Sequence, residues 1–391
     1  MVLSEKLKQE LIRAVERGEV AGANILILKD GKEAAYAQAG YADLEEKRHF
    51  ERDTITRLYS MTKPVTSAAA MALMERGLLD LGANVQEFLP GFQNAMVAGE
   101  EGLVPVRRPV RIQDLLQMTS GLVYGGAAPC ISYSETEKLF EEIKARLFGE
   151  EALGTVEIAN RLGQIPLAFQ PGSAWQYGTS ADVLGAVIEV ISGKRFGEFL
   201  RETFFEPLEM EDTAFYVPEE KQSRLAKVYE RTAEGLALYT QSHLGIMNTM
   251  EKQPAFESGG AGLASTMDDY SHFAAMLMAQ GTYKGREILK PQTVRFMTGG
   301  ELLSWQQEVF DHNWDSLGGY TYGNLMRVAK EPGKTFFMAT EGEYGWDGWL
   351  GDYFSNSPKN GITILISQQL RDAGTTSLTR RLKNIVWSEL A

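Results

Sequence analysis

Ser60 and Lys63 form the strongest chemical signal in the sequence, because they stand three residues apart at the start of an alanine-rich run. In a helix, residues three apart lie on one face, so the lysine amine can reach the serine hydroxyl without help from another element. A serine hydroxyl is a weak nucleophile, and a neighbouring amine with a depressed pKa can take its proton. Pro64 fits the first turn of a helix, where free N–H groups favour an anion. A nucleophile at Ser60, a proton acceptor at Lys63 and donors for an oxyanion could therefore all come from one helical turn.

The residues around Lys63 distinguish two interpretations. In one, Lys63 is a buried catalytic base; in the other, it is a solvated lysine at an exposed helix start. A serine and a lysine at this spacing occur by chance in most proteins of this size. Here the pair precedes residues 68–72, an alanine- and methionine-rich run that is typical of a buried helix. A buried lysine loses its charge easily. We therefore favour the catalytic interpretation.

The composition favours a globular protein that acts on small molecules. The chain has 391 residues, of which 44% are hydrophobic and 23% are charged, as in ordinary globular proteins. The formal net charge of -13 argues against nucleic acid as a partner, because no basic stripe is present to replace phosphate counterions. No run approaches about 18 apolar residues, so no membrane span is expected. The sequence leaves open whether the chain forms a homo-oligomer.

The N-terminal region and the cysteine content predict a cytoplasmic location. Residues 1–22 have the pattern of an amphipathic, charged helix and lack the apolar core of a signal peptide. Cys130 is the single cysteine, which excludes an internal disulfide and fits a reducing compartment.

Strand patterns lie at both ends of the chain, and helical patterns lie in the middle. We expect a β-hairpin followed later by three consecutive strands, at residues 23–28, 33–40, 335–340, 345–354 and 361–367. We expect helices at residues 1–22, from Ser60 to about 77, from about Ser180, at 266–281 and at 376–390.

This order of elements predicts an α+β fold. One antiparallel sheet would be built from the N- and C-terminal segments and flanked by helices, with a mostly helical domain packed against it. We expect residues 1–83 and 241–391 to form a discontinuous sheet domain and residues 84–240 to form the helical domain. The active site would then lie in the cleft between the two.

Around and beyond Ser60, five segments carry motifs in a consistent order. They are residues 54–89, 112–122, 170–173, 177–185 and 259–265. Together they resemble the serine β-lactamase and penicillin-binding-protein superfamily, although no single segment is specific. The closest resemblance is to the class C β-lactamase-like branch that holds the family VIII carboxylesterases and related acyltransferases. The resemblance implies a β-lactamase/transpeptidase-like fold and a serine hydrolase.

The resemblance also implies roles for three side chains. Ser60 corresponds to the acylated nucleophile, Lys63 to its proton acceptor, and Tyr177 to the tyrosine that protonates the leaving group and activates the deacylating water. A phenol with a pKa of about 10 becomes a usable base only beside a cation such as Lys63. The alternative is that Tyr177 is a core aromatic before a helix. Thr179 and Asp182 fit a Thr-x-x-Asp helix cap, which favours a structural role for Asp182.

The third motif of the superfamily is changed in this chain. Penicillin-binding proteins carry Lys-Thr-Gly on a strand beside the site. The best match here is Trp346-Asp347-Gly348-Trp349, where the esterase branch typically has Trp-x-Gly. Gly348 would let a substrate approach the backbone. The resemblance implies that the N–H groups of Trp349 and Ser60 form the oxyanion hole, a feature worth several kcal/mol in acyl transfer; the alternative is that both tryptophans are ordinary sheet aromatics.

This change bears on the substrate. The lysine of the motif would attract a carboxylate, and Trp346 stands in its place. Asp347 either points away from the cleft or adds a negative charge to it. In the second case it would repel a substrate carboxylate, by roughly 4 kcal/mol for two unit charges about 4 Å apart. The lost cation favours a neutral small-molecule ester. Tyr124 resembles an aromatic that lines the pocket of this family. The alternative is that it is a surface-loop tyrosine. Residues 121–146 and 302–317 are expected to shape the pocket.

Two other functions remain open. The first is a β-lactamase, a D-aminopeptidase or a D-amino-acid amidase, in which Asp347 would pair with an amino group of the substrate. The second is an acyl-binding or sensor protein that is acylated without turnover. The presence of Tyr177 argues against the second, because losing this residue is the simplest route to an inactive relative.

Other chemistries lack their motifs in this sequence. The four histidines are scattered without metal-ligand spacing, so no metal is expected. The sequence has no Gly-x-Ser-x-Gly elbow, and the glycines at 260–262 lack the third glycine of a dinucleotide loop. We therefore expect no cofactor.

Overall fold

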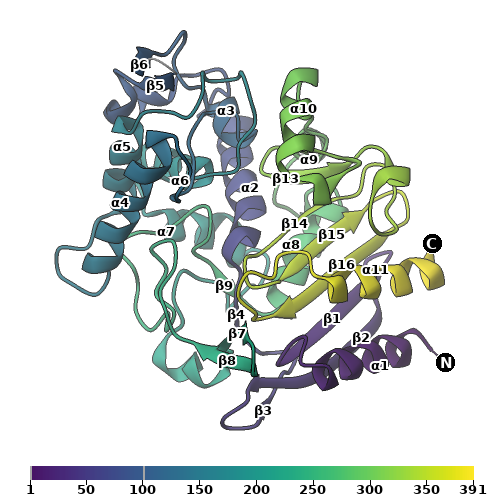
Figure 1. Ribbon diagram of the computed structural model, residues 1–391. Helices are drawn as coiled ribbons and strands as arrows, with labels where there is room; N and C mark the ends of the chain where they lie inside the picture. The colour runs from purple at the N-terminus through teal and green to yellow at the C-terminus, as the bar shows by residue number, and fades with distance from the viewer. Residues whose placement is uncertain (1, 100–101) are drawn as a thin grey trace.

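A large antiparallel sheet forms the centre of the computed structural model, which describes residues 2–99 and 102–391. Its strand order is β12-β13-β14-β15-β16-β1-β2-β3, so the two ends of the chain meet where β16 pairs with β1 (Figure 1). The strands are β1 (Gly22–Lys29), β2 (Lys32–Asp43), β3 (Arg48–His49), β12 (Tyr320–Gly323), β13 (Met326–Ala329), β14 (Tyr344–Asp347), β15 (Tyr353–Ser357) and β16 (Ile362–Gln368). The predicted α+β fold, with a sheet built from both ends of the chain, is confirmed.

Alternating side chains place this sheet between two layers of helices. In β1, Ile25 and Ile27 belong to the cluster that packs against α1 (Leu3–Glu16) and α11 (Ser377–Leu390). Leu26 lies between them in sequence but joins the main core on the opposite face, because successive strand residues point to opposite faces. The apolar run at residues 25–28 of this strand therefore serves two cores.

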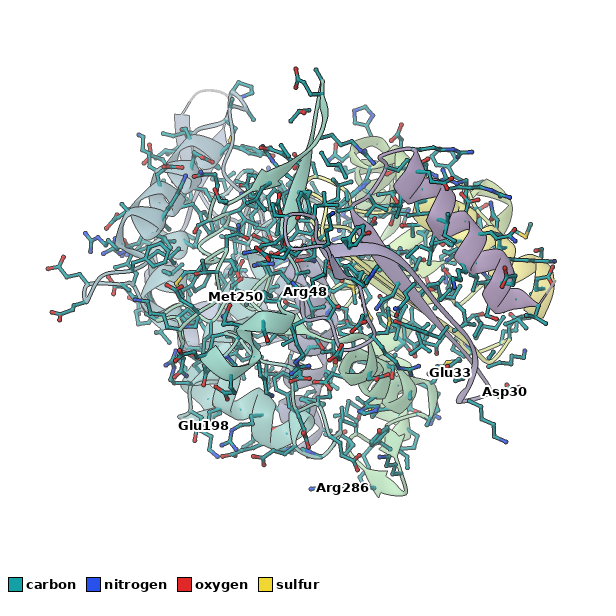
Figure 2. The ribbon with its side chains drawn as sticks, turned by 90° about the horizontal axis from the view of Figure 1, so that it is seen from below. Asp30, Glu33, Arg48, Glu198, Met250 and Arg286 are labelled. Atoms are coloured by element: carbon teal, nitrogen blue, oxygen red, sulfur yellow. The ribbon has the colours of Figure 1, made fainter. Side chains whose placement is uncertain are left out.

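The turn of the β1–β2 hairpin lies at the margin of the molecule, where Figure 2 shows Asp30 and Glu33. Asp30 has a φ of 51° and precedes Gly31 at 74°, the left-handed backbone of a tight turn. Arg52 holds the hairpin through an ion pair with Glu33 at 2.8 Å. The hairpin predicted from the sequence is present.

Helix α2 lies between the sheet and the helices α4 to α7 (Figure 1). Besides α1 and α11, the described helices are α2 (Thr62–Glu75), α3 (Ile112–Leu116), α4 (Ile131–Arg146), α5 (Thr155–Gln164), α6 (Ser180–Ser192), α7 (Phe196–Leu200), α8 (Met267–Met278), α9 (Pro291–Thr298) and α10 (Ser304–Asn313). Four short strand pairs complete the chain: β4 (Thr56–Arg57) with β9 (Ala264–Ser265), β5 (Met96–Gly99) with β6 (Gly102–Pro105), β7 (Val228–Thr232) with β8 (Gly235–Tyr239), and β10 (Thr282–Tyr283) with β11 (Arg286–Glu287). Within the described ranges, no helix combines the length and the apolar character that a membrane crossing needs.

The predicted helices that start near residues 60, 180, 266 and 376 are all present. The N-terminal helix ends at Glu16 rather than near residue 22, and the predicted first residue, Met1, lies outside the described residues. The domain boundaries drawn from the sequence stay a prediction.

Two strand predictions in the C-terminal third are wrong. Residues 335–340 form bends and loop, and the strand pair lies earlier, as β12 and β13. The turn between these two strands has Asn324 and Leu325 at φ 49° and 62°, which is the pattern of a type I′ turn without its usual Asn-Gly sequence. Residues 345–354 were expected to form one strand, but they form β14, a tight turn and the start of β15.

Candidate active site

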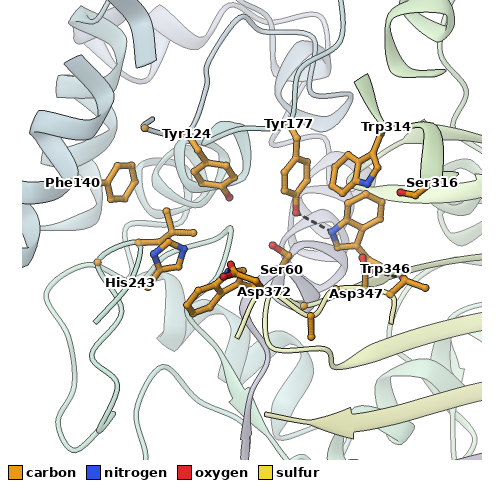
Figure 3. A pocket seen from close by; sticks show the side chains of 18 of the residues that line it. Ser60, Tyr124, Phe140, Tyr177, His243, Trp314, Ser316, Trp346, Asp347 and Asp372 are labelled. Carbon is orange, nitrogen blue, oxygen red and sulfur yellow. Dashed lines mark hydrogen bonds between the residues drawn. The ribbon is translucent and has the colours of Figure 1, made fainter. Parts of the chain in front are cut away.

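A cavity of about 580 Å³ contains Ser60 and is lined from both the sheet and the helical half (Figure 3). Its walls come from residues 124–125, the inner side of α4, residues 242–245, residues 314–317, Phe337, residues 346–349, residues 372–375 and Arg380. The two segments predicted to shape the pocket, 121–146 and 302–317, both contribute. All predicted site residues line this cavity except Lys63, which is buried behind Ser60.

Ser60 lies on the short turn that precedes α2. The residue before it, Tyr59, is buried and has a φ of 44°, a left-handed conformation that costs a residue with a side chain of order 1–3 kcal/mol. Packing holds this strained residue, because the Tyr59 ring meets the ring of Trp349 at 4.9 Å. The turn is also tied to the rest of the core by the Leu58 N–H, which donates to the Leu263 carbonyl at 2.9 Å.

Lys63 is fully buried and touches the nucleophile directly. Its Nζ lies 3.1 Å from Ser60 Oγ, 3.1 Å from Tyr124 Oη and 2.9 Å from the Gly260 carbonyl. Burial lowers the pKa of Lys63 to about 7, and two nearby carboxylates oppose only part of this shift. A large fraction of these amines is therefore uncharged at neutral pH and able to accept a proton.

Tyr177 lines the cavity together with Ser60. Its phenol oxygen accepts a hydrogen bond from Trp346 Nε1 at 2.9 Å. Lys63 Nζ lies over the Tyr177 ring, 4.5 Å from its centroid, rather than beside the oxygen. Burial raises the pKa of Tyr177 above its ordinary value, and the neighbouring Ser60 and Trp346 side chains only reduce the shift. Tyr177 is therefore a protonated phenol at neutral pH, and it can donate a proton before it can accept one.

Tyr124 contacts the base as well as the cavity. Its oxygen accepts a hydrogen bond from Lys63 at 3.1 Å, and its ring meets that of Tyr177 at 5.7 Å. The alternative of a surface-loop tyrosine is thereby excluded. No local sequence pattern indicates the contact with Lys63, because the two residues are 61 positions apart.

Asp182 fixes the turn that holds Lys63. Its Oδ1 accepts hydrogen bonds from the Gly260 N–H at 3.0 Å and the Ser258 hydroxyl at 2.5 Å, and the Gly260 carbonyl then accepts from Lys63. The predicted Thr-x-x-Asp cap is wrong: the Thr179 side chain makes no capping bond, and its buried hydroxyl has no partner among the described residues. Asp182 reaches across to another loop instead of back to its own helix.

Trp346 takes part in the site through its N–H group as well as its ring. It is 1% exposed and packs against the rings of Tyr177, Trp314 and Tyr322 at 5.5, 5.7 and 5.0 Å. Its indole N–H is directed at the phenol oxygen of Tyr177 (Figure 3). The interpretation of Trp346 as a sheet aromatic alone is therefore incomplete.

The Asp347 carboxylate is bound by two other side chains of the protein. Its carboxylate pairs with Arg327 Nη1 at 3.3 Å and accepts a hydrogen bond from Thr375 Oγ1 at 2.5 Å. The Arg327 side chain is 1% exposed, so this partner is held permanently against it. The positive charge of Arg327 therefore offsets the negative charge of Asp347 that the sequence suggested for the site.

The turn after β14 brings Trp349 next to the nucleophile turn. The Gly348 N–H donates to the Asp352 carbonyl at 2.7 Å, and the Trp349 carbonyl accepts from the Ala373 N–H at 2.9 Å. A Cβ on residue 348 would lie 2.3 Å from the carbonyl oxygen of Leu58. Glycine is thus required by the approach of two backbone segments, whereas the sequence suggested the approach of a substrate.

His243 belongs to the cavity wall, although its sequence context gave no signal for it. Its ring stacks on Trp349 at 4.1 Å, and Asp372 accepts the Trp349 Nε1–H at 2.7 Å on the same wall. Burial lowers the pKa of His243 to about 4. His243 is therefore a neutral imidazole that packs against the tryptophan beside Ser60.

Comparison with known proteins identifies the family. The sequence profile of the β-lactamase family matches residues 7–383. This chain belongs to the β-lactamase family. Protein Rv1367c of Mycobacterium tuberculosis is 30% identical over 367 residues, which cover 91% of this chain and 88% of that protein. Esterase EstB of Burkholderia gladioli is 28% identical over 400 residues, which cover 99% of this chain and 95% of the esterase.

A solved structure supports the same assignment. EstCE1, described as a hydrolase with promiscuous acyltransferase activity, has a TM-score of 0.81 and 26% identity to this chain, with 98% of each chain covered. The superfamily and its family VIII carboxylesterase-like branch, predicted from the motifs, are confirmed.

Proposed function

We propose that this protein is a serine hydrolase that cleaves small carboxylic esters through an acyl-enzyme on Ser60. One observation carries the proposal: the buried amine of Lys63 lies 3.1 Å from the Ser60 hydroxyl, and burial lowers its pKa to about 7. The relatives named as an esterase and as a hydrolase support this chemistry. The absence of a cationic side chain at position 346 supports a substrate without a carboxylate at that position.

Acylation uses the three side chains in sequence. Lys63 takes the hydroxyl proton as Ser60 Oγ attacks the ester carbonyl. The N–H groups of Ser60 and Trp349 stabilise the oxyanion. Tyr177 gives its proton to the leaving alcohol, and the Trp346 N–H stabilises the phenolate that results. The products of this half-reaction are the free alcohol, the acyl-enzyme, an ammonium on Lys63 and a phenolate on Tyr177.

Deacylation reverses these proton positions. The Tyr177 phenolate removes a proton from water as the water oxygen attacks the acyl carbonyl. The Lys63 ammonium returns its proton to Ser60 Oγ as the acyl group leaves. The ester and one water have then become an acid and an alcohol, and the protein is restored. Tyr177 thus acts as a base only after acylation has left a cation beside it, which refines the role that the resemblance implied.

Two features weigh against the alternative functions. The pairing of Asp347 with Arg327 leaves this carboxylate less able to bind the amino group of a D-amino-acid amide or peptide. The presence of Tyr177 in the same cavity as Ser60 favours turnover over lasting acylation in a sensor protein.

The function is tested by comparing kcat/KM on p-nitrophenyl butyrate, nitrocefin and D-alanine amide. We expect the butyrate ester to exceed the other two by about 10²-fold or more, with an acyl adduct that decays during turnover. A higher value on nitrocefin or on the amide would make the protein a lactamase or an amidase. An adduct that persists after the ester is consumed would identify a sensor.

Gly348→Ala is expected to lower kcat/KM for p-nitrophenyl butyrate about 10²-fold. The added methyl would meet the Leu58 carbonyl, so the end of β14 must move away from the nucleophile turn, and displacements of about 1 Å have effects of this size. Gly333→Ala is the matched control, because nothing lies within 4 Å of a Cβ at that position. If both variants hydrolyse the ester as the wild type does, the backbone contact does not position the site.

The cytoplasmic location is retained as part of the proposal, supported by the single, unpaired Cys130. The proposed partner is a small-molecule ester rather than nucleic acid. A homo-oligomer remains open.

A further inference from the structure

Arg380 supplies a cation to the cavity that no carboxylate of the protein neutralises in the described part of the chain. It lies in the first turn of α11 and lines the cavity half-buried. Its Nη1 donates to the Thr375 carbonyl at 3.1 Å, which fixes the position of the side chain. Among the residues that the structure describes, no Asp or Glu oxygen comes within 4.0 Å of it, although most other arginines have such a partner.

The other charges on this side of the cavity are compensated. Asp347 pairs with the buried Arg327 at 3.3 Å. Lys383 of α11 pairs with Glu343 at 2.5 Å with both side chains buried. Each pair contributes no net charge, so the charge of Arg380 is left over. This side of the cavity is therefore positive.

The opposite side of the cavity carries the reverse charge. Glu137 and Glu141 of α4 line it, with Lys144 as the nearby cation. Asp372 lines the cavity between the two walls, and Arg371 lies 3.2 Å from that carboxylate. The balance on the α4 wall is negative. A substrate with one charged end would therefore be oriented by the two walls.

The position of Tyr177 indicates which wall faces the alcohol half of an ester and which faces the acyl half. Under the proposed function, Tyr177 protonates the leaving alcohol, so this alcohol lies next to the Tyr177 oxygen. Trp346 holds that oxygen on the side of the cavity where Figure 3 shows Trp314 and Ser316. Arg380 is tied to this side through Thr375, whose carbonyl accepts from Arg380 and whose hydroxyl donates to Asp347, which Figure 3 shows beside Trp346. The acyl group then takes the other direction, toward the wall where Figure 3 shows Phe140 and His243.

We propose that Arg380 binds a carboxylate on the alcohol half of the substrate, so that the preferred substrates are esters of hydroxy acids. The planar guanidinium has free N–H donors beyond the one used by Thr375, and it matches a carboxylate in two parallel hydrogen bonds. The aromatic side chain of Trp314 and the apolar side chain of Leu317 would cover the carbon chain between the ester oxygen and this carboxylate. This inference rests on the proposed function and revises its expectation of a neutral substrate.

The test compares two butanoyl esters that differ only in charge. One is 3-(butanoyloxy)benzoate, and the other is 3-(butanoyloxy)benzamide, which has the same size without the carboxylate. The measured quantity is the ratio of kcat/KM for the charged ester to that for the neutral ester. This ratio is expected to fall about tenfold in Arg380→Gln, mainly through KM, and to recover in part in Arg380→Lys, which restores the charge without the bidentate geometry.

Two controls make the result specific. Arg295→Gln removes the same charge from an exposed position on α9 outside the cavity and is expected to keep the wild-type ratio. Moving the carboxylate to the acyl half, in p-nitrophenyl hemisuccinate against p-nitrophenyl butyrate, should abolish the dependence on Arg380. An unchanged ratio in Arg380→Gln would overturn the proposal. An Arg380 dependence for the hemisuccinate would also overturn it, because the carboxylate would then lie on the acyl side.

Failure of this inference is distinguishable from failure of the proposed function. The role of Arg380 alone is rejected if wild type and Arg380→Gln show the same ratio of kcat/KM for the charged and neutral esters while Ser60→Ala abolishes turnover of both. Hydrolysis of both benzoate-type esters that survives in Ser60→Ala rejects the acyl-enzyme itself.

Discussion

Ser60→Ala is expected to lower the turnover of p-nitrophenyl butyrate by about 10⁴-fold or more. The variant removes the oxygen that forms the acyl-enzyme, so Lys63 and Tyr177 keep their positions without a group to activate. Intact-mass spectrometry during turnover should show a butanoyl adduct on the wild type and none on the variant. The fold should persist, because Ser60 is half-buried at the cavity and only a hydroxyl is lost.

Ser67→Ala is the matched control for this result. Ser67 lies on α2, which follows the Ser60 turn, is fully buried, and its hydroxyl has no hydrogen-bond partner among the described residues. Its removal should leave hydrolysis unchanged and should leave thermal stability equal or higher, because a buried hydroxyl without a partner is unfavourable. Retained hydrolysis and a retained adduct in Ser60→Ala would remove Ser60 from the mechanism.

Lys63→Met is expected to lower kcat/KM on the same ester about 10³-fold, the size of a lost general base. Methionine is apolar and of similar length, so it fits the buried position while removing the amine. The loss should appear in the acylation step, measured as the rate of adduct formation. An acylation rate within threefold of wild type would show that another group takes the Ser60 proton.

The same variant has an opposite effect on stability. Folding lowers the pKa of Lys63 from 10.5 to about 7, so the unfolded chain holds this proton more tightly than the folded protein. The resulting cost is about 5 kcal/mol below pH 7 and disappears as the pH rises from 7 to 10.5. The unmatched Gly260 carbonyl in the variant offsets about 1–3 kcal/mol of this gain.

Denaturant unfolding at pH 7, 8.5 and 10 measures this effect. The free energy of unfolding of Lys63→Met relative to wild type should be highest at pH 7 and should decrease toward pH 10. A difference that is constant across this range would show that Lys63 keeps an ordinary pKa in the folded protein.

The sequence predicted the nucleophile turn because its chemistry is local. Ser60 and Lys63 need only one helical turn to meet, and the run after them signals that the turn is buried. The sheet of both chain ends was predicted because strand patterns lie near both ends of the chain and helical patterns lie between them. Tyr177 required the family resemblance, because it meets Ser60 only through the fold.

Strand positions in the C-terminal third could not be predicted from apolar content. Phe336 and Met338 are 64% and 51% exposed, so the alternation that suggested a strand at 335–340 reflects a loop with one buried residue, Phe337. The true strand β13 has no such alternation, because all four of its residues are buried. Its hairpin turn also lacks the usual glycine at Leu325.

The charges around the cavity were equally hidden in the sequence. Arg327 has no motif that marks it as the partner of Asp347, because strand pairing and the turn after β14 bring the two together. Arg380 and Arg381 stand side by side on one helix, yet Arg381 pairs with Glu10 and Glu19 while Arg380 faces the cavity. Only the three-dimensional structure shows that Arg381 forms structural ion pairs while Arg380 is available to a ligand.

The pH dependence of Ser60 acylation in the wild type tests the role of an uncharged Lys63 most directly. Adduct formation from p-nitrophenyl butyrate would be quenched at short times between pH 5 and 9 and quantified by intact-mass spectrometry. We expect the rate to fall tenfold per pH unit below about 7, the pKa to which burial lowers Lys63, and to be level above it. An acylation rate that does not change between pH 5 and 9 would contradict the role of Lys63 as the base.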